Sequence, residues 1–254
     1  MSAEPAGAAG TPLPLLVLSG MLCDAGLWSE VAFPEGHEIR HLPLTEPDIG
    51  RQGDRVLGAV PGPFVLAGHS LGAIVGFEVV RRAPDRVAGL CVMSTNAGAP
   101  RAGQYAAWRE LDALIAGGDF TEAVERTLPG MFGSPRPGPA RAERYRRMAC
   151  AVGPEAARAQ LAAQATRTDA LAALRTADCP AVVLHGTRDT LCPPSFHAAI
   201  TAALPRGQRR EVEGAGHLLP WERPEAVSTA LRDLLAEAET ARRAPADPTA
   251  CTPR

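Results

Sequence analysis

The chain has 254 residues, a mass of 26.6 kDa and a formal charge of −2, with 46% hydrophobic and 21% charged residues. This composition predicts a folded globular protein and gives no overall attraction for nucleic acid or for an anionic membrane surface. All 26 basic residues are arginine, which excludes Schiff-base catalysis and a phosphate-binding loop that depends on lysine.

Short apolar runs alternate with amphipathic stretches along most of the chain, a pattern typical of βαβ units and a mainly parallel, doubly wound α/β sheet. The expected strands are Leu15–Ser19, Glu38–Leu42, Pro63–Gly68, Val87–Ser94, Ala181–Gly186 and Arg209–Glu213. The expected helices between and after them are Gln52–Val60, Leu71–Arg82, Ser195–Leu204 and Pro224–Glu239. Together these elements predict one core domain made of residues 13–97 and 177–240, with flexible tails at 1–12 and 241–254.

No strand-like run occurs between the two parts of the predicted core, although apolar periodicity continues there. The expected helices in this region are Gln104–Ala116, Phe120–Leu128, Ala140–Val152 and Pro154–Arg167. Residues 98–176 carry too many apolar side chains to stay solvated as a linker, and they therefore predict a helical insertion that packs against the core.

The cysteines and the N-terminal region argue against metal binding, secretion and membrane insertion. No two cysteines form a C-x-x-C pair, and none has a histidine at zinc-ligand spacing. The apolar run Leu13–Leu18 is too short for a signal sequence or a membrane span. We therefore expect a cytoplasmic protein that contains reduced thiols and needs no cofactor or metal.

The most informative motif is Gly68-His69-Ser70-Leu71-Gly72, which lies between a predicted strand and a predicted helix. A G-x-S-x-G sequence at such a junction forces the serine onto a tight turn, where its hydroxyl is exposed above the helix N-terminus. Glycines are needed there because a Cβ atom would collide with the neighbouring strand or helix. Ser70 is therefore the candidate nucleophile.

A serine nucleophile needs a base and a third group that orients the base. His217 is the candidate base, because it follows the last predicted strand in a loop at the carboxyl edge of the sheet. Asp189 is the candidate acid, because it follows the strand Ala181–Gly186 at the same edge. The other histidines lie at strand ends, on a helix or beside the serine: His37, His41, His69, His185 and His197. The order Ser70, Asp189, His217 is that of one fold family in particular.

These residues resemble the α/β-hydrolase family over roughly residues 13–235. The resemblance rests on several blocks in the expected order: Leu18–Asp24 with Trp28, Gly68–Gly72, Ala83–Val87, Gly186–Asp189 ahead of Pro193-Pro194, and Gly214–His217 ahead of Glu222–Glu225. It implies that residues 98–176 form a cap, inserted after the sixth family strand. The family's first two antiparallel strands have no obvious counterpart here, so we expect a sheet that is shortened at its N-terminal edge.

The resemblance also implies an oxyanion hole formed by the backbone N–H groups of Met21 and Leu71. Many family members have His-Gly before the first donor, whereas this chain has Ser19-Gly20. The change leaves the backbone donor in place but alters the loop that borders the acyl group. Six further residues near the predicted edge or in the insertion are candidates for substrate binding: Leu22, Trp28, Asn96, Trp108, Met131 and Leu218.

The predicted function is hydrolysis of a carboxylic ester, thioester or lactone of a small, largely apolar substrate through a Ser-His-Asp triad and an acyl-enzyme. Its expected partner is that small acyl substrate, and the oligomeric state stays open. Three alternatives share the triad: a thioesterase that releases or cyclises a biosynthetic product, a C–C bond hydrolase, and a small-molecule receptor. A serine on the turn argues against the dehalogenase and epoxide hydrolase branches, which place an aspartate there.

Overall fold

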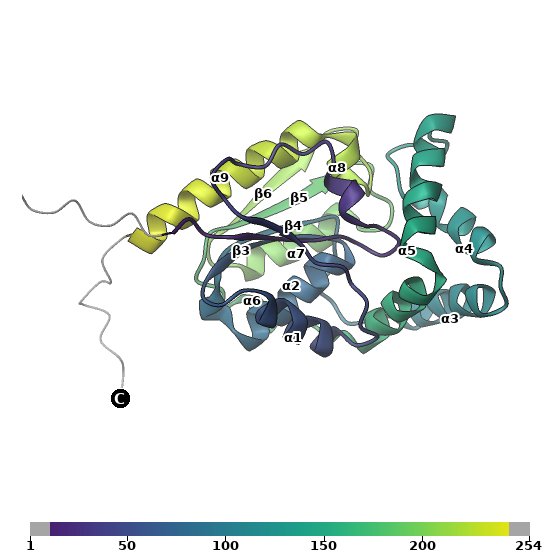
Figure 1. Cartoon of the computed structure of the whole chain (residues 1–254), viewed down its shortest axis with the longest axis horizontal. Helices are drawn as coiled ribbons and strands as arrows, with labels where there is room; N and C mark the ends of the chain where they lie inside the picture. Colours follow the sequence, from purple (N-terminus) through teal and green to yellow (C-terminus); the bar gives the residue numbers. More distant parts are fainter. Residues whose placement is uncertain (1–10, 244–254) are drawn as a thin grey trace, which may run out of the picture.

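The computed structural model describes residues 11–243, which form a parallel sheet with helices on both faces (Figure 1). The strands are β1 (Leu15–Leu18), β2 (Ile39–His41), β3 (Phe64–His69), β4 (Val87–Met93), β5 (Ala181–Gly186) and β6 (Gly207–Val212). Their order is β2-β1-β3-β4-β5-β6, and every neighbouring pair is parallel. The predicted α/β fold is therefore confirmed, and residues 11–243 contain no antiparallel strand at the N-terminal edge.

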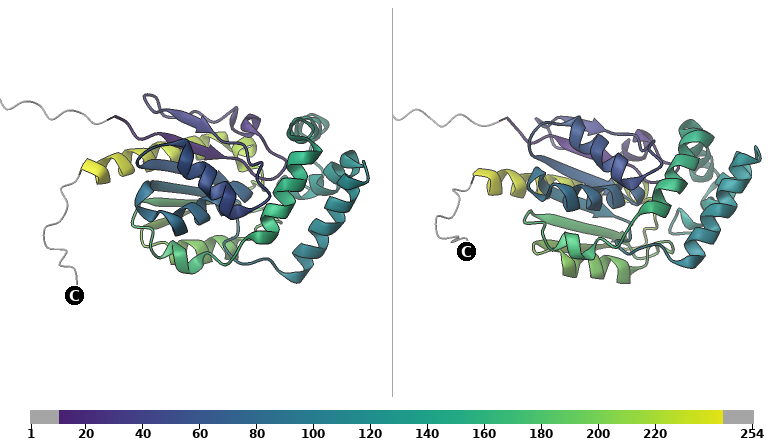
Figure 2. Two further views of the ribbon diagram at one scale, coloured as in Figure 1. Left: turned by 60° about the horizontal axis from the view of Figure 1, so that its bottom comes forward. Right: turned by 90° about the horizontal axis from the view of Figure 1, so that it is seen from below.

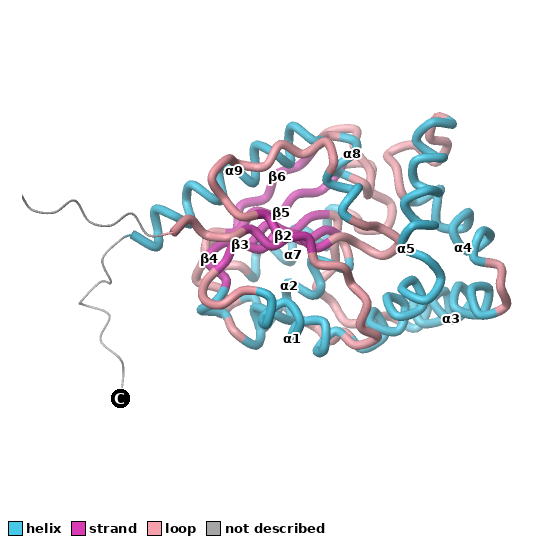
Figure 3. The backbone as a smooth tube through the Cα atoms, viewed as in Figure 1, coloured by secondary structure: helices cyan, strands magenta, loops and turns pink. Residues whose placement is uncertain are grey.

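Both faces of the sheet are buried, because alternate residues of each strand enter different cores. Leu15 and Val17 of β1 belong to one core, together with residues of α9 (Pro224–Arg243). Leu16 and Leu18 belong to the other core, which also contains residues of the four helices on the opposite face of the sheet. Those helices are α1 (Ile49–Ala59), α2 (Leu71–Arg82), α6 (Leu171–Leu174) and α7 (Pro194–Ala203). Figure 3 shows the strands in magenta between these two layers of helix.

Residues 94–180, all of which are described, contain helices and loops and no strand. Their main helices are α3 (Ala102–Ala116), α4 (Phe120–Thr127) and α5 (Pro139–Thr166). These three helices stand together beside one end of the sheet in all the views of Figures 1 and 2. The helix α5 contains a break at Gly153, whose φ of 80° interrupts the helical backbone ahead of Pro154. The sequence analysis predicts two separate helices here, Ala140–Val152 and Pro154–Arg167, and in the structure they are joined end to end as α5.

Several helix ends differ from the sequence prediction. The helix α1 begins three residues early, because the Asp48 side chain accepts a hydrogen bond from the Arg51 N–H and caps it. The helix α9 continues to Arg243, three residues into the segment predicted as a tail. The rest of the predicted tails, apart from residues 11 and 12, lies outside the described residues. The short helices α6 and α8 (Leu219–Glu222) were not predicted, because neither is long enough to show periodicity.

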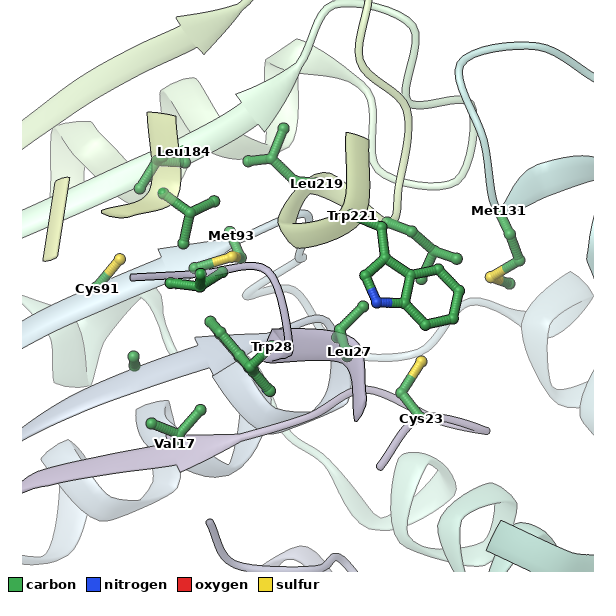
Figure 4. Close-up of a cluster of buried hydrophobic side chains, with 14 of the residues drawn as sticks. Val17, Cys23, Leu27, Trp28, Cys91, Met93, Met131, Leu184, Leu219 and Trp221 are labelled. Atoms are coloured by element: carbon green, nitrogen blue, oxygen red, sulfur yellow. The ribbon is translucent and has the colours of Figure 1, made fainter. Parts of the chain in front are cut away.

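A cluster of buried side chains joins the sheet to the helical insertion (Figure 4). Trp28, at the end of the 3₁₀ helix η1 (Ala25–Trp28), is 1% exposed and donates its indole N–H to Ser19 Oγ at 2.9 Å. Trp221 of α8 donates its indole N–H to the Gly26 carbonyl at 2.9 Å. Met131, from the insertion, belongs to the same cluster. The insertion therefore shares a core with the sheet.

Candidate active site

Ser70 occupies the sharp turn between β3 and α2. Its backbone has φ 51° and ψ −114°, a strained conformation for a residue with a Cβ atom. The turn is held by the Ser70 N–H, which donates to the Met93 carbonyl at 2.9 Å. The Ser70 side chain does not cap α2, so its hydroxyl is not bonded to the backbone of the helix that follows it.

The two glycines of the motif are required by close backbone contacts. A Cβ atom on Gly68 would lie 2.5 Å from the Cα of Ala73, and one on Gly72 would lie 2.3 Å from the carbonyl oxygen of Leu18. Both separations are too short for any real Cβ contact. Gly72 thus allows the first turn of α2 to pack directly on the end of β1.

We expect Gly72→Ala to lower the free energy of unfolding by about 3 kcal/mol, because backbone atoms of β1 would have to move. Urea denaturation followed by circular dichroism measures this change. The matched control is Gly58→Ala in α1, where a Cβ atom would meet nothing within 4 Å; it should raise the stability by about 0.5–1 kcal/mol through helix propensity. An unchanged stability in Gly72→Ala would contradict this account of the turn.

Asp189 and His217 form a buried pair at the carboxyl edge of the sheet. His217 Nδ1 lies 2.9 Å from Asp189 Oδ2, and the two side chains are 6% and 0% exposed. The other carboxylate oxygen, Oδ1, accepts the N–H groups of Leu191 and Cys192, each at 2.9 Å. With Nδ1–H donating to the aspartate, the Nε2 atom of His217 is left to act as a base.

The pair also shifts the protonation of both groups. Burial by itself would lower the pKa of His217, but the charge of Asp189 and the hydrogen bond to it outweigh burial and raise that pKa. Burial would raise the pKa of Asp189, but the charge of His217 and the three hydrogen bonds to the carboxylate lower it. Asp189 is therefore an anion at neutral pH and stabilises the protonated form of His217.

The loop that carries His217 is fixed by close packing against the insertion. A Cβ atom on Gly216 would lie 2.1 Å from the backbone nitrogen of Gly133. The buried carboxylate of Glu222 accepts the N–H of Gly216 at 2.6 Å and that of Gly133 at 3.0 Å. His69 Nε2 lies 2.9 Å from the His217 carbonyl, so its ring lies against the loop.

Ser70 and His217 line one pocket of about 360 Å³, which lies between the sheet edge and the insertion. The structure brings these two residues to the same cavity, and His217 is hydrogen-bonded to Asp189. Among the described residues, Ser70 and His217 are not hydrogen-bonded to each other. Three of the six predicted substrate-binding residues also line this pocket: Asn96, Trp108 and Met131.

The other three predicted substrate-binding residues are packed in the core and do not line the pocket. The indole N–H of Trp28 is hydrogen-bonded to the Ser19 hydroxyl. Leu218 is fully buried, and its N–H donates to the Met131 carbonyl at 2.9 Å. Leu22 is 3% exposed and belongs to the same core. Leu22 and Leu218 directly follow the site residues Met21 and His217 in the sequence, but tertiary packing places their side chains in the core.

Met21 and Leu71, the predicted oxyanion-hole donors, lie on the loop after β1 and at the first position of α2. Within the described part of the chain, neither N–H donates to another backbone or side-chain group. The Met21 loop is held from the insertion: the next N–H, that of Leu22, donates to Gln160 Oε1 at 2.9 Å. Gln160 in turn donates to the Leu44 carbonyl at 3.1 Å. Leu22 has a φ of 59°, a strain that this bridge helps to maintain.

Sequence reasoning missed three residues in or beside the pocket. Thr95 donates its hydroxyl to the Ser70 carbonyl at 3.0 Å, and its N–H donates to the neutral ring of His197 at 3.0 Å. The Cys192 thiol lies close to the Asp189–His217 pair: its Sγ atom, a carboxylate oxygen of Asp189 and a ring nitrogen of His217 all lie within 4.8 Å of one another. Arg167, at the end of α5, also lines the pocket. No spacing signal marks any of them, because each reaches the pocket only through tertiary folding.

The comparison with known families agrees with this architecture. The alpha/beta hydrolase family model matches residues 23–230, and the chain therefore belongs to the alpha/beta hydrolase family. A curated Mycobacterium tuberculosis protein, named as a non-heme bromoperoxidase, BpoC, is 39% identical over 67 residues. That match covers 26% of each chain, so this chain matches about a quarter of the length of the curated relative.

Two solved structures extend the likeness to nearly the whole chain. A thermophilic esterase from Thermogutta terrifontis, in a malate-bound form, is 27% identical with a TM-score of 0.77 over 91% of this chain and 92% of its own. The enol-lactonase from Burkholderia xenovorans LB400 is 20% identical with a TM-score of 0.76 over 89% of this chain and 92% of its own. Among the described helices, none combines the length and the apolar character needed to cross a bilayer.

Proposed function

We propose that this protein is a serine hydrolase that cleaves a carboxylic ester, thioester or lactone of a small substrate. The observation that carries the proposal is that His217, joined to the buried Asp189 at 2.9 Å, shares one pocket with a serine on a strained strand-to-helix turn. The esterase and enol-lactonase that share the fold support this class of reaction. The size of the pocket fits a small acyl substrate.

In the proposed mechanism the Ser70 hydroxyl turns to His217 Nε2, which accepts its proton as the oxygen attacks the carbonyl carbon. The N–H groups of Met21 and Leu71 bind the oxyanion that forms. The tetrahedral intermediate then collapses to the acyl-enzyme, and His217 protonates the departing alkoxide or thiolate. A water molecule attacks the acyl-enzyme in the same way and releases the acid. Asp189 holds the tautomer of His217 and stabilises its cation throughout. The helices of residues 98–176 cap the pocket.

Two measurements on the wild-type protein test this proposal. A fluorophosphonate probe should label the protein at Ser70, as located by peptide mass spectrometry, and 4-nitrophenyl acetate or butyrate should be turned over. Labelling without turnover of any ester, thioester or lactone would favour a small-molecule receptor instead. Labelling at another residue would show that the nucleophile is wrongly assigned.

A further inference from the structure

Arg167 is a buried cation beside the candidate active site without a carboxylate partner. It is the residue that follows α5, and only 6% of it is exposed. It lines the same pocket as Ser70 and His217. No Asp or Glu of the described residues pairs with its guanidinium. A guanidinium stays charged in a protein even when buried, so this positive charge lacks a neutralising partner.

The contacts that Arg167 does make are weak and neutral. Its two terminal nitrogens donate to Gln164 Oε1 and to Gln104 Oε1, both at the long distance of 3.3 Å. Its guanidinium lies over the Trp108 ring, 5.4 Å from the ring centre. The third nitrogen, Nε, is buried and has no hydrogen-bond partner. Buried donors are nearly always satisfied in folded proteins, so an unsatisfied one beside a pocket points to a ligand.

The other arginines of the insertion show that this arrangement is not general. Several are solvent-exposed or half-exposed and pair with a carboxylate: Arg126 with Glu122, Arg144 with Glu30, Arg146 with Glu125, and Arg158 with Asp112. The remaining arginines of the insertion that have no carboxylate partner are solvent-exposed, whereas Arg167 is buried and lines the pocket.

The position of Arg167 also connects it to the reacting groups. The Cys192 thiol is close enough to both His217 and Arg167 for each of them to lower its pKa, although burial is the larger effect and raises that pKa. The carboxylate of the site, Asp189, is fully buried and is already bonded to His217 and two backbone N–H groups. It is therefore not available to neutralise Arg167.

We propose that Arg167 binds a carboxylate of the substrate, so that this enzyme acts on an ester or lactone that carries a free carboxylate. A planar carboxylate can accept Nε–H and a terminal N–H of the guanidinium together, which satisfies the orphaned donor and the buried charge at once. The inference rests on the proposed hydrolase function. It adds the chemical class of the substrate and names a specificity-determining residue.

Paired substrates test the inference on the intact protein. For a carboxylate on the acyl half, 4-nitrophenyl hydrogen glutarate is compared with its neutral methyl ester. For a carboxylate on the alcohol half, 4-acetoxybenzoate is compared with methyl 4-acetoxybenzoate. In at least one pair, the wild-type kcat/KM for the anionic ester should exceed that for the neutral ester by at least about tenfold. The pair that shows this preference identifies the half that carries the charge.

The variant Arg167→Gln should remove the preference, by lowering kcat/KM for the anionic ester at least about tenfold, mainly through KM, with much less effect on the neutral ester. Arg167→Lys should restore part of it, because it keeps the charge but not the planar fork. The matched control is Arg158→Gln, which alters an arginine of α5 that lies outside the pocket and is paired with Asp112, and it should leave the preference unchanged. A purely structural role of Arg167 would lower both rates equally.

Two results would overturn the inference in different ways. If neutral esters are hydrolysed but neither pair shows a preference for the anion, or if Arg167→Gln keeps the preference, the carboxylate site is wrong while the hydrolase function stands. If no ester is hydrolysed and no phosphonate reacts at Ser70, the proposed function fails and this inference fails with it.

Discussion

Replacing Ser70 by alanine is expected to lower kcat for 4-nitrophenyl butyrate by about 10⁴-fold or more and to abolish phosphonate labelling. The reason is that Ser70 is the proposed nucleophile: it lies on a strained turn and lines the same pocket as His217. Steady-state kinetics and mass spectrometry of the labelled peptide measure the two effects. The folding of the variant is checked by its thermal transition.

The necessary control is Cys192→Ala, because Cys192 is the other nucleophilic side chain close to His217. Burial raises the pKa of this thiol, so it stays protonated and is a poor nucleophile. We therefore expect Cys192→Ala to keep phosphonate labelling at Ser70. If Ser70→Ala remained active and Cys192→Ala did not, the thiol would be the nucleophile.

The second large effect is expected for Asp189→Asn, which should lower kcat by about 10⁴-fold, because an amide favours the wrong tautomer of His217. His217 must be neutral to accept the serine proton, so activity falls as the pH drops through its pKa. Asp189 raises that pKa, and the wild-type midpoint should therefore lie above the ordinary histidine value of about 6.5. In Asp189→Asn the raising effect is lost while burial still lowers the pKa, so the midpoint should move to lower pH.

The profile of kcat/KM between about pH 5 and 11 measures this shift, because the pKa of His217 is raised to about 10. The control Asp233→Asn removes an exposed carboxylate of α9 that pairs with Arg210 and should change neither kcat nor the midpoint. A midpoint that does not move in Asp189→Asn would show that the carboxylate does not control the protonation of His217.

Much of the core fold follows from patterns that are local in the chain. The apolar run Phe64–Ala67 and the glycines at positions 68 and 72 predict a buried strand, a tight turn and a helix, because each depends on nearby residues. The structure has β3 and α2 at these positions. The order of strands and helices, and the helical character of residues 98–176, could be predicted in the same way. Helix ends were less accurate, since caps such as Asp48 act over a single hydrogen bond.

The composition of the pocket could be predicted only in part. Ser70, Asp189 and His217 follow strand ends, and parallel strands bring their carboxyl ends to one edge of the sheet. Leu22 and Trp28 come after β1 in the sequence and Leu218 comes after β6, yet the side chains of all three pack in the core. Their direction depends on backbone angles and on contacts with distant residues, which adjacency in the sequence does not fix.

The sequence by itself determined the α/β architecture and the residues that carry the candidate chemistry, because strand periodicity, glycine spacing and chain order are local properties. Only the tertiary structure decided what surrounds them. Gln160 holds the Met21–Leu22 loop across 138 positions of sequence, and Arg167 reaches the pocket as one arginine among 26 basic residues. Such contacts arise when α5 packs against the core, and no spacing along the chain encodes which buried side chain is left without a partner.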